Sequence, residues 1–201
     1  MIKITNIFSK YKSLIPYIVW FLFAALLNII GSKFIGIYFP DRPIVPDLVF
    51  SISPYWEWTQ YLSDPTFIIS IIIFIVVLRK KFTVNFLKEI IISLTLINLL
   101  RGLIIPLTPL GRPANPNQPY GIFPFIQNGM FTSGHAGAQF LFYLLVPKTF
   151  RSLKITMLFF FIIQVFALLT SRGHYSIYII GGMMIAYICF GWTNKYLANN
   201  Q

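Results

Sequence analysis

The segment TSRGHYSIYIIGG (Thr170–Gly182) opens an apolar run with an arginine and a histidine. A membrane-spanning helix needs neither residue, and ionisable side chains in such a setting point to function. Two features need an explanation: the purpose of His174, and the aromatic side chain of Tyr178 four residues later. This polar opening is therefore the first candidate for a functional site.

The composition places the segment in a membrane protein. Of the 201 residues, 57% are hydrophobic and 10% are charged, whereas soluble domains carry about 25% charged residues. The net charge of +11 would suit nucleic acid, but the basic residues form short clusters between apolar runs, as membrane topology requires. We therefore expect an integral membrane protein that binds no nucleic acid. With two histidines and one cysteine in the chain, we expect no dedicated metal site.

Six apolar stretches predict membrane-spanning helices, which need about 20 mostly apolar residues each. The predicted fold class is all-α: a polytopic membrane protein with six transmembrane helices and one domain, 1–201. The spans lie at about 14–31, 65–79, 84–106, 131–147, 153–170 and 175–192. Leu62 and Asp64 extend the short second span. Long connections follow the first and third spans, at Ser32–Asp64 and Leu107–Asn128.

Basic residues favour one side of this arrangement. Eleven of the sixteen Lys and Arg residues precede the first span, separate the second from the third and the fourth from the fifth, or follow the sixth. The positive-inside rule then places both termini in the cytoplasm. The opposite face receives His135 and His174, at the starts of the fourth and sixth spans. A composition rich in Ile, Phe, Lys and Asn suggests a bacterial plasma membrane, with this face toward the periplasm or exterior.

The segment Thr132-Ser133-Gly134-His135 has the residue types of an anion-binding helix start. Serine or threonine can cap a helix, whose free amides attract anions, and glycine lets a ligand approach the backbone. A histidine just inside could give a proton to a leaving oxygen. The alternative interpretation is a capped helix with an interfacial histidine.

The second histidine segment, Ser171–His174, pairs a histidine with an arginine. The fork of Arg172 suits phosphate oxygens, and His174 could be a nucleophile that forms a covalent phosphoimidazole. The alternative is an arginine that reaches the lipid headgroups, with the histidine beside it. Arg101, near the outer end of the third span, and Arg112, in the following loop, add positive charge to the same face.

These two histidine segments resemble the type 2 phosphatidic acid phosphatase superfamily, and more closely its sphingomyelin synthase-like branch. The similar motifs are SGH at one helix start and HYSI about forty residues later. The stretch PDLVFSISPY (Pro46–Tyr55) is similar to part of the branch's first outer loop, so the resemblance covers Pro46 to about Gly182. It implies six spans and a phosphatase or headgroup transferase that acts on a membrane phospholipid or lipid phosphate through a phosphohistidine, without metal or cofactor.

The resemblance also assigns roles to residues. His174 would be the nucleophile that attacks phosphorus, and His135 the general acid for the leaving group. Ser133, the amide of Gly134 and Arg172 would hold phosphate oxygens. The arginines Arg101 and Arg112 are further candidates for phosphate binding.

Three positions depart from the family's pattern. Ile105 stands where the phosphatase branch has a phosphate-binding lysine, and Leu168 stands where that branch has an arginine. Tyr178 stands where the family has an aspartate, one helical turn after the nucleophile. That carboxylate orients the ring and stabilises its developing positive charge, and losing such a group from a triad can cost about 10⁴ in turnover.

Three interpretations of Tyr178 stay open. Another outer acid, Asp47, Glu57 or Asp64, substitutes for the aspartate; or Tyr178 itself orients the ring in a slow enzyme; or the chain is a pseudoenzyme that binds lipid phosphate without cleaving it. A small lipid carrier is a further alternative. Against the carrier, the inner halves of the predicted spans contain few polar residues apart from Glu89.

An aromatic cluster precedes the second span, with Trp56, Glu57 and Trp58 at its centre. Aromatic rings with an acid can enclose a quaternary ammonium group such as choline. Tryptophan and tyrosine are also common at any membrane boundary. The sequence therefore allows a headgroup site here, with an interfacial aromatic belt as the simpler interpretation.

Overall fold

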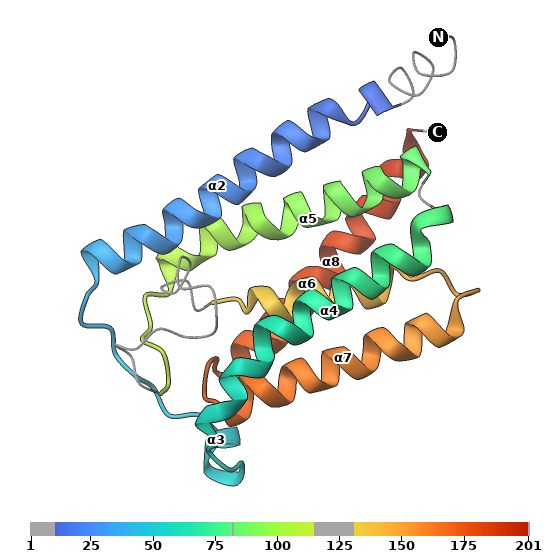
Figure 1. Ribbon diagram of the computed structural model, residues 1–201. Coiled ribbons are helices and arrows are strands. Elements are labelled where there is room, and N and C mark those ends of the chain that lie inside the picture. Colours follow the sequence, from blue (N-terminus) through green and yellow to red (C-terminus); the bar gives the residue numbers. More distant parts are fainter. Residues whose placement is uncertain (1–10, 82, 115–130, 201) are drawn as a thin grey trace, which may run out of the picture.

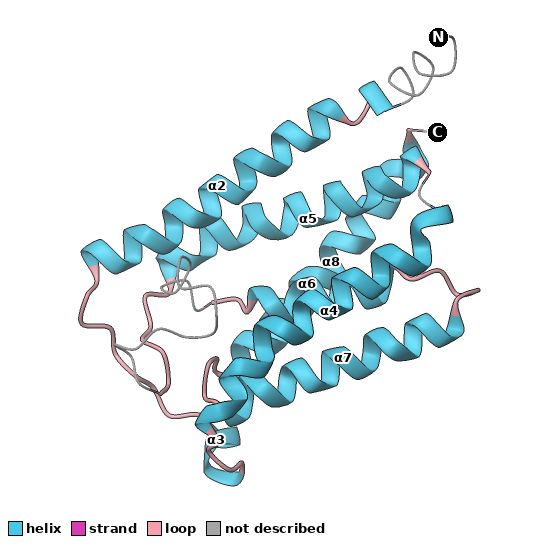
Figure 2. Cartoon of the chain, viewed as in Figure 1, coloured by secondary structure: helices cyan, strands magenta, loops and turns pink. Residues whose placement is uncertain are grey.

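The computed structural model describes residues 11–81, 83–114 and 131–200. In these residues the chain forms helices and connecting loops only (Figures 1 and 2). Most of the predicted Leu107–Asn128 loop lies outside the described residues, as do Lys3 and Lys10 of the N-terminal basic cluster. The α-helices are α2 (Ile15–Tyr38), α3 (Leu48–Ile52), α4 (Gln60–Leu78), α5 (Val84–Ile104), α6 (Gly134–Leu145), α7 (Arg151–Thr170) and α8 (Ser176–Asn199), and the 3₁₀ turns are η1 (Glu57–Thr59), η2 (Arg79–Lys81) and η3 (Ile105–Leu107).

Five helical segments are long and apolar enough to cross a membrane: α2, η1 with α4, α5 with η3, α7 and α8. Large apolar side chains are exposed on their outer faces; Trp20, Ile162 and Trp192, for example, are more than half exposed. In water such faces would be costly, whereas in lipid they need no cover. The described chain is therefore all-α with five candidate membrane spans.

The segment predicted as the fourth span, 131–147, contains a much shorter helix. Helix α6 has 12 residues, roughly 18 Å of helix against a hydrocarbon core of about 30 Å. It begins after Ser133, which caps it, and ends at Leu145, since the backbone of Val146 is extended. Pro147 follows, and a residue before proline is disfavoured in helical conformation. Among the described residues, five of the six predicted spanning helices are therefore found.

The first predicted span ends too early. Helix α2 continues through Gly31-Ser32-Lys33 to Tyr38, although the sequence predicted an end near 31. The reason is tertiary packing: a Cβ at Gly31 would lie 2.8 Å from the carbonyl oxygen of Gly102 on α5. Glycine here allows two helix backbones to touch rather than ending a helix. The predicted extension of the second span by Leu62 and Asp64 is confirmed, since α4 begins at Gln60.

The helices lie side by side in a bundle, with α2 against α5, α4 against α7, and α6 between α7 and α8 (Figure 1). The connection between α4 and α5 lies at the same end of the bundle as the end of α8. Helix α3, the α7–α8 connection and the start of α6 lie at the other end. The predicted site residues gather at this second end.

A close approach between α6 and α8 brings the histidine segments together. A Cβ at Gly182 would lie 2.7 Å from the carbonyl oxygen of Ser133 and 3.2 Å from the amide nitrogen of Gly137. Only a residue without a side chain leaves room for both backbones. The core then continues away from the site through buried apolar side chains of five helices, including Phe74, Ile97, Leu141, Met157 and Ala186.

We expect Gly182→Ala to lower the thermal unfolding temperature of the purified protein in detergent. The added methyl would collide with the Ser133 carbonyl, and overpacking of this kind costs about 1–3 kcal/mol. Gly191→Ala on the same helix is the matched control, because nothing lies within 4 Å of its Cβ position. There the gain in helix propensity should leave the melting temperature equal or higher. Equal shifts for both variants would contradict the close-approach argument.

Candidate functional site

Backbone contacts join the two histidine segments. The amide of Ser133 donates to the carbonyl of Tyr178 at 3.0 Å. Beside this bond, a Cβ at Gly181 would lie 3.1 Å from Cγ2 of Thr132. The start of α6, with His135, and the start of α8, with His174, therefore form one continuous surface although they lie about forty residues apart in the sequence.

The start of α6 combines a helix N-terminus with a buried cation. Ser133 caps the helix, since its Oγ accepts from the amide of Ala136 at 3.3 Å. A Cβ at Gly134 would overlap the guanidinium of Arg101, so the two are in direct contact. Nε of Arg101 is buried and has no hydrogen-bond partner among the described residues. The positive end of a helix dipole and an arginine repel each other unless an anion lies between them.

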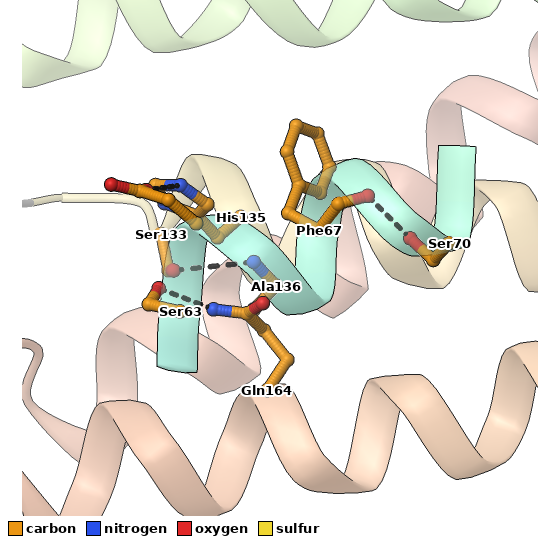
Figure 3. Close-up of polar contacts among 8 residues, drawn as sticks. Ser63, Phe67, Ser70, Ser133, His135, Ala136 and Gln164 are labelled. Carbon is orange, nitrogen blue, oxygen red and sulfur yellow. Dashed lines mark hydrogen bonds and ion pairs between the residues drawn. The ribbon is translucent and has the colours of Figure 1, made fainter. Parts of the chain in front are cut away.

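A carboxylate supports the histidine at this helix start. Nε2 of His135 lies 2.9 Å from Oδ1 of Asp64 on α4 (Figure 3). The side chain of His135 is 31% exposed and that of Asp64 only 6%. The ring of Phe67 meets the His135 ring edge-on, with the centroids 5.3 Å apart. Asp64 is one of the three acids predicted to assist His174, and the structure pairs it with His135.

Further polar side chains lie deeper in the bundle. Nε2 of Gln164 donates to Oγ of Ser63 at 2.6 Å, linking α7 to α4 (Figure 3). Gln139, one turn after His135, is fully buried, and neither end of its amide has a hydrogen-bond partner among the described residues. The sequence analysis did not select these three residues. A glutamine within an apolar run was the available signal, because polar side chains inside spans are costly.

His174 lies in the tight connection between α7 and α8. The amide of Gly173 donates to the carbonyl of Leu168 at 2.9 Å, and Arg172 has a positive φ of 51°. His174 is 8% exposed. Its ring packs edge-on against Tyr178, with the centroids 6.4 Å apart. The hydroxyl of Tyr178 is buried and makes no hydrogen bond to any described residue, so Tyr178 contacts His174 as an apolar ring.

Arg172 binds aromatic side chains. Its guanidinium lies over the rings of Phe50 and Tyr55, 5.5 and 5.2 Å from their centroids. Nη2 also donates to the carbonyl of Phe50 at 3.4 Å. These cation–π contacts fix the arginine against α3 and the segment that follows it. The residue predicted to hold phosphate thus ties an outer loop to the α7–α8 connection.

Asp47, another predicted substitute acid, caps two helices. Its carboxylate accepts from the amide and the hydroxyl of Ser176 at the start of α8, at 2.6 and 3.0 Å. It also accepts from the amide of Val49 in α3, at 2.9 Å. A carboxylate at a helix N-terminus satisfies free amides and opposes the helix dipole favourably. The start of α8 therefore carries its own anion, whereas the side chain that caps α6 is the neutral hydroxyl of Ser133.

Tyr175 completes the attachment of this outer loop. Its hydroxyl accepts from the amide of Val45 at 3.0 Å. Burial, with the nearby Asp47 carboxylate, raises the pKa of the Tyr175 hydroxyl above its ordinary value of 10. The group therefore stays neutral at physiological pH. A cavity of about 210 Å³ remains between this loop and α8, with Asp47, Tyr175 and Tyr178 among its lining residues.

The remaining predicted residues lie around this end of the bundle. Arg112 is buried, and its Nε donates to the carbonyl of Ala114. Trp56 stacks on Trp58, with the centroids 6.5 Å apart, and its ring also meets that of Phe166 of α7 edge-on. Trp56, Glu57 and Trp58 are all exposed.

The three outer acids predicted to assist His174 have different settings. Asp64 supports a histidine, Asp47 caps helices, and Glu57 is exposed on η1. Within the described ranges, no three His, Cys, Asp or Glu side chains lie close enough together to hold a metal ion. The structure therefore places a carboxylate-supported imidazole beside a helix N-terminus and an arginine guanidinium.

Comparison with known proteins adds no relative. No protein-family model matches the sequence, and no curated protein sequence matches it either.

Tyr178→Phe should leave the stability unchanged or raise it. The substitution removes a buried hydroxyl that has no partner among the described residues, and such a group costs about 1–3 kcal/mol. Thermal unfolding in detergent measures this effect. A clear drop in melting temperature would show that the hydroxyl makes a bond that these contacts do not include. Tyr175→Phe, which removes the bond to Val45, is the matched control and should destabilise.

Proposed function

We propose that this protein is a lipid phosphate phosphatase or a lipid headgroup transferase that works through a covalent phosphohistidine at the non-cytoplasmic membrane face. The substrate class is a membrane phospholipid or lipid phosphate. The chain crosses the membrane six times, with α6 and the residues that follow it making the fourth passage. Both termini are then cytoplasmic, and the histidine segments face the periplasm or exterior of a bacterial cell.

One observation carries this proposal: the Arg101 guanidinium lies against the first residue of α6, beside a histidine that is paired with a carboxylate. Helix amides and an arginine are the groups that stabilise charge on a transferring phosphoryl group. A histidine within reach of the same anion can attack phosphorus or protonate the leaving oxygen. These are the components that phosphoryl transfer needs.

The setting favours a lipid as the phosphate ester. The site lies at the ends of apolar helices whose outer faces suit a bilayer, which supports a position at headgroup depth. Exposed Trp56 and Trp58 flank this end of the bundle, as interfacial aromatic side chains do. Water or a lipid hydroxyl can serve as the acceptor, since both follow the same first half-reaction.

A second candidate function is binding of lipid phosphate without turnover. It is favoured by Tyr178, which stands where the resemblance expects an aspartate and whose hydroxyl makes no hydrogen bond to a described residue. The anion site of Arg101 and α6 would then serve recognition alone.

Release of phosphate or headgroup from a lipid panel in detergent separates the two functions. We expect turnover by the wild-type chain, and its loss in His135→Ala and His174→Ala. Binding without turnover in the wild type, with release appearing only in Tyr178→Asp, would support the second candidate. Absence of both binding and release for every lipid would contradict the proposed function.

Arg101→Gln should lower kcat/KM by roughly 10²–10³, the usual effect of removing one group that stabilises transition-state charge. The reason is that the guanidinium would contact phosphate oxygens at the start of α6. Arg79→Gln is the matched control, because Arg79 is exposed directly after the last residue of α4, at the end of the bundle away from the site. An equal loss in both variants, or none in Arg101→Gln, would count against the anion site.

A further inference from the structure

We infer that His135, supported by Asp64, is the nucleophile that takes the phosphoryl group, and that His174 acts as the acid and base. This inference rests on the proposed function. It exchanges the roles that the sequence resemblance assigns to the two histidines.

The hydrogen bond to Asp64 decides which nitrogen of His135 can react. A carboxylate only accepts, so Nε2 of His135 carries the proton that is shared with Oδ1 of Asp64 over 2.9 Å. Nδ1 then holds the free lone pair. The carboxylate keeps the ring in this tautomer and stabilises the positive charge that the ring gains when Nδ1 forms a bond. Asp64 is thus a positioning residue for a nucleophilic His135.

The phosphate-binding groups lie on the same side as His135. Gly134, its immediate neighbour, contacts the Arg101 guanidinium, and the amides of Gly134 and His135 are in the first turn of α6, where the helix offers them no acceptor. In the proposed reaction, a phosphoryl group held at this position reacts with Nδ1 of His135. The side chain of His135 is 31% exposed, which leaves it accessible to substrate.

The surroundings of His174 differ in access. His174 is 8% exposed and packs against the ring of Tyr178. Tyr178 stands at the position where the resemblance expects an aspartate, and the Asp47 carboxylate accepts from Ser176. We assign the proton exchange with the leaving and entering oxygens to this less exposed imidazole, because that role forms no bond to phosphorus.

The reaction balances as follows. Nδ1 of His135 donates its lone pair to phosphorus, and the bond from phosphorus to the ester oxygen breaks. That oxygen keeps the bonding pair and takes a proton from the His174 imidazolium. In the second half, water or a lipid hydroxyl gives its proton to His174 and attacks phosphorus. The phosphorus–nitrogen bond breaks, and its electron pair returns to Nδ1.

A substrate with an activated leaving group tests the assignment. The nitrophenolate of p-nitrophenyl phosphate or p-nitrophenyl phosphorylcholine leaves without a proton, so loss of the general acid is tolerated while loss of the nucleophile is not. We expect the wild-type chain in detergent to release nitrophenolate and to carry the transferred group on His135, phosphate from the first ester and phosphorylcholine from the second, detected by mass spectrometry under alkaline conditions. His174→Ala should keep or increase this labelling, and His135→Ala should abolish it.

The outcomes distinguish this inference from the proposed function. Labelling that persists in His135→Ala and disappears in His174→Ala would overturn the exchange of roles and leave phosphohistidine chemistry in place. No label and no release from either the p-nitrophenyl esters or the lipid panel would overturn the proposed function itself. Should His135→Ala fail to fold, His135→Gln keeps a donor for Asp64 and still lacks the nucleophile, so it must also show no label.

Asp64→Asn provides an independent test of the positioning role. We expect kcat on p-nitrophenyl phosphate to fall by about 10⁴ with little change in KM, as when an orienting carboxylate is replaced by its amide. Asp64→Glu should restore part of the rate. Asp41→Asn, an exposed acid in the outer loop after α2, is the matched control and should leave both constants unchanged. Unchanged kcat in Asp64→Asn would contradict the role of Asp64.

Discussion

The site depends on the close approach of α6 to α8, where Gly182 lies against the backbone of Ser133 and Gly137. This contact sets the depth at which α6 begins, and it aligns the amide of Ser133 with the carbonyl of Tyr178. Because α6 is short and lies among longer helices, its N-terminus opens at one end of the bundle. The positions of His135 and of the first-turn amides follow from this single packing constraint.

The electrostatics of the two helix starts are opposite in kind. At α8 the carboxylate of Asp47 satisfies the free amide of Ser176 and neutralises the helix end. At α6 the Arg101 guanidinium lies against the first residue and adds to the positive potential, while the Asp64 carboxylate pairs with the side chain of His135. The first-turn amides of α6 and this guanidinium are therefore the groups to which we assign the phosphate.

The outer loop between α2 and α4 explains the positions of residues to which side-chain chemistry alone would assign other roles. Arg172 looks like a phosphate ligand in sequence, and it lies over the rings of Phe50 and Tyr55. Tyr175 bonds the amide of Val45. Together with Asp47, these side chains attach the loop to the start of α8. They hold the loop in place at this end of the bundle, beside a cavity of about 210 Å³.

The sequence by itself determined the all-α class, the candidate spans other than the fourth, and the candidate residues at the helix starts, because apolar length and capping residues are local properties. It did not determine that 131–147 contains only a 12-residue helix. Pro147 follows the end of this helix, but the apolar composition of the whole segment predicted a longer one. Only the tertiary structure decided that Asp64 pairs with His135, because the residues lie 71 positions apart and spacing carries no information about such a contact.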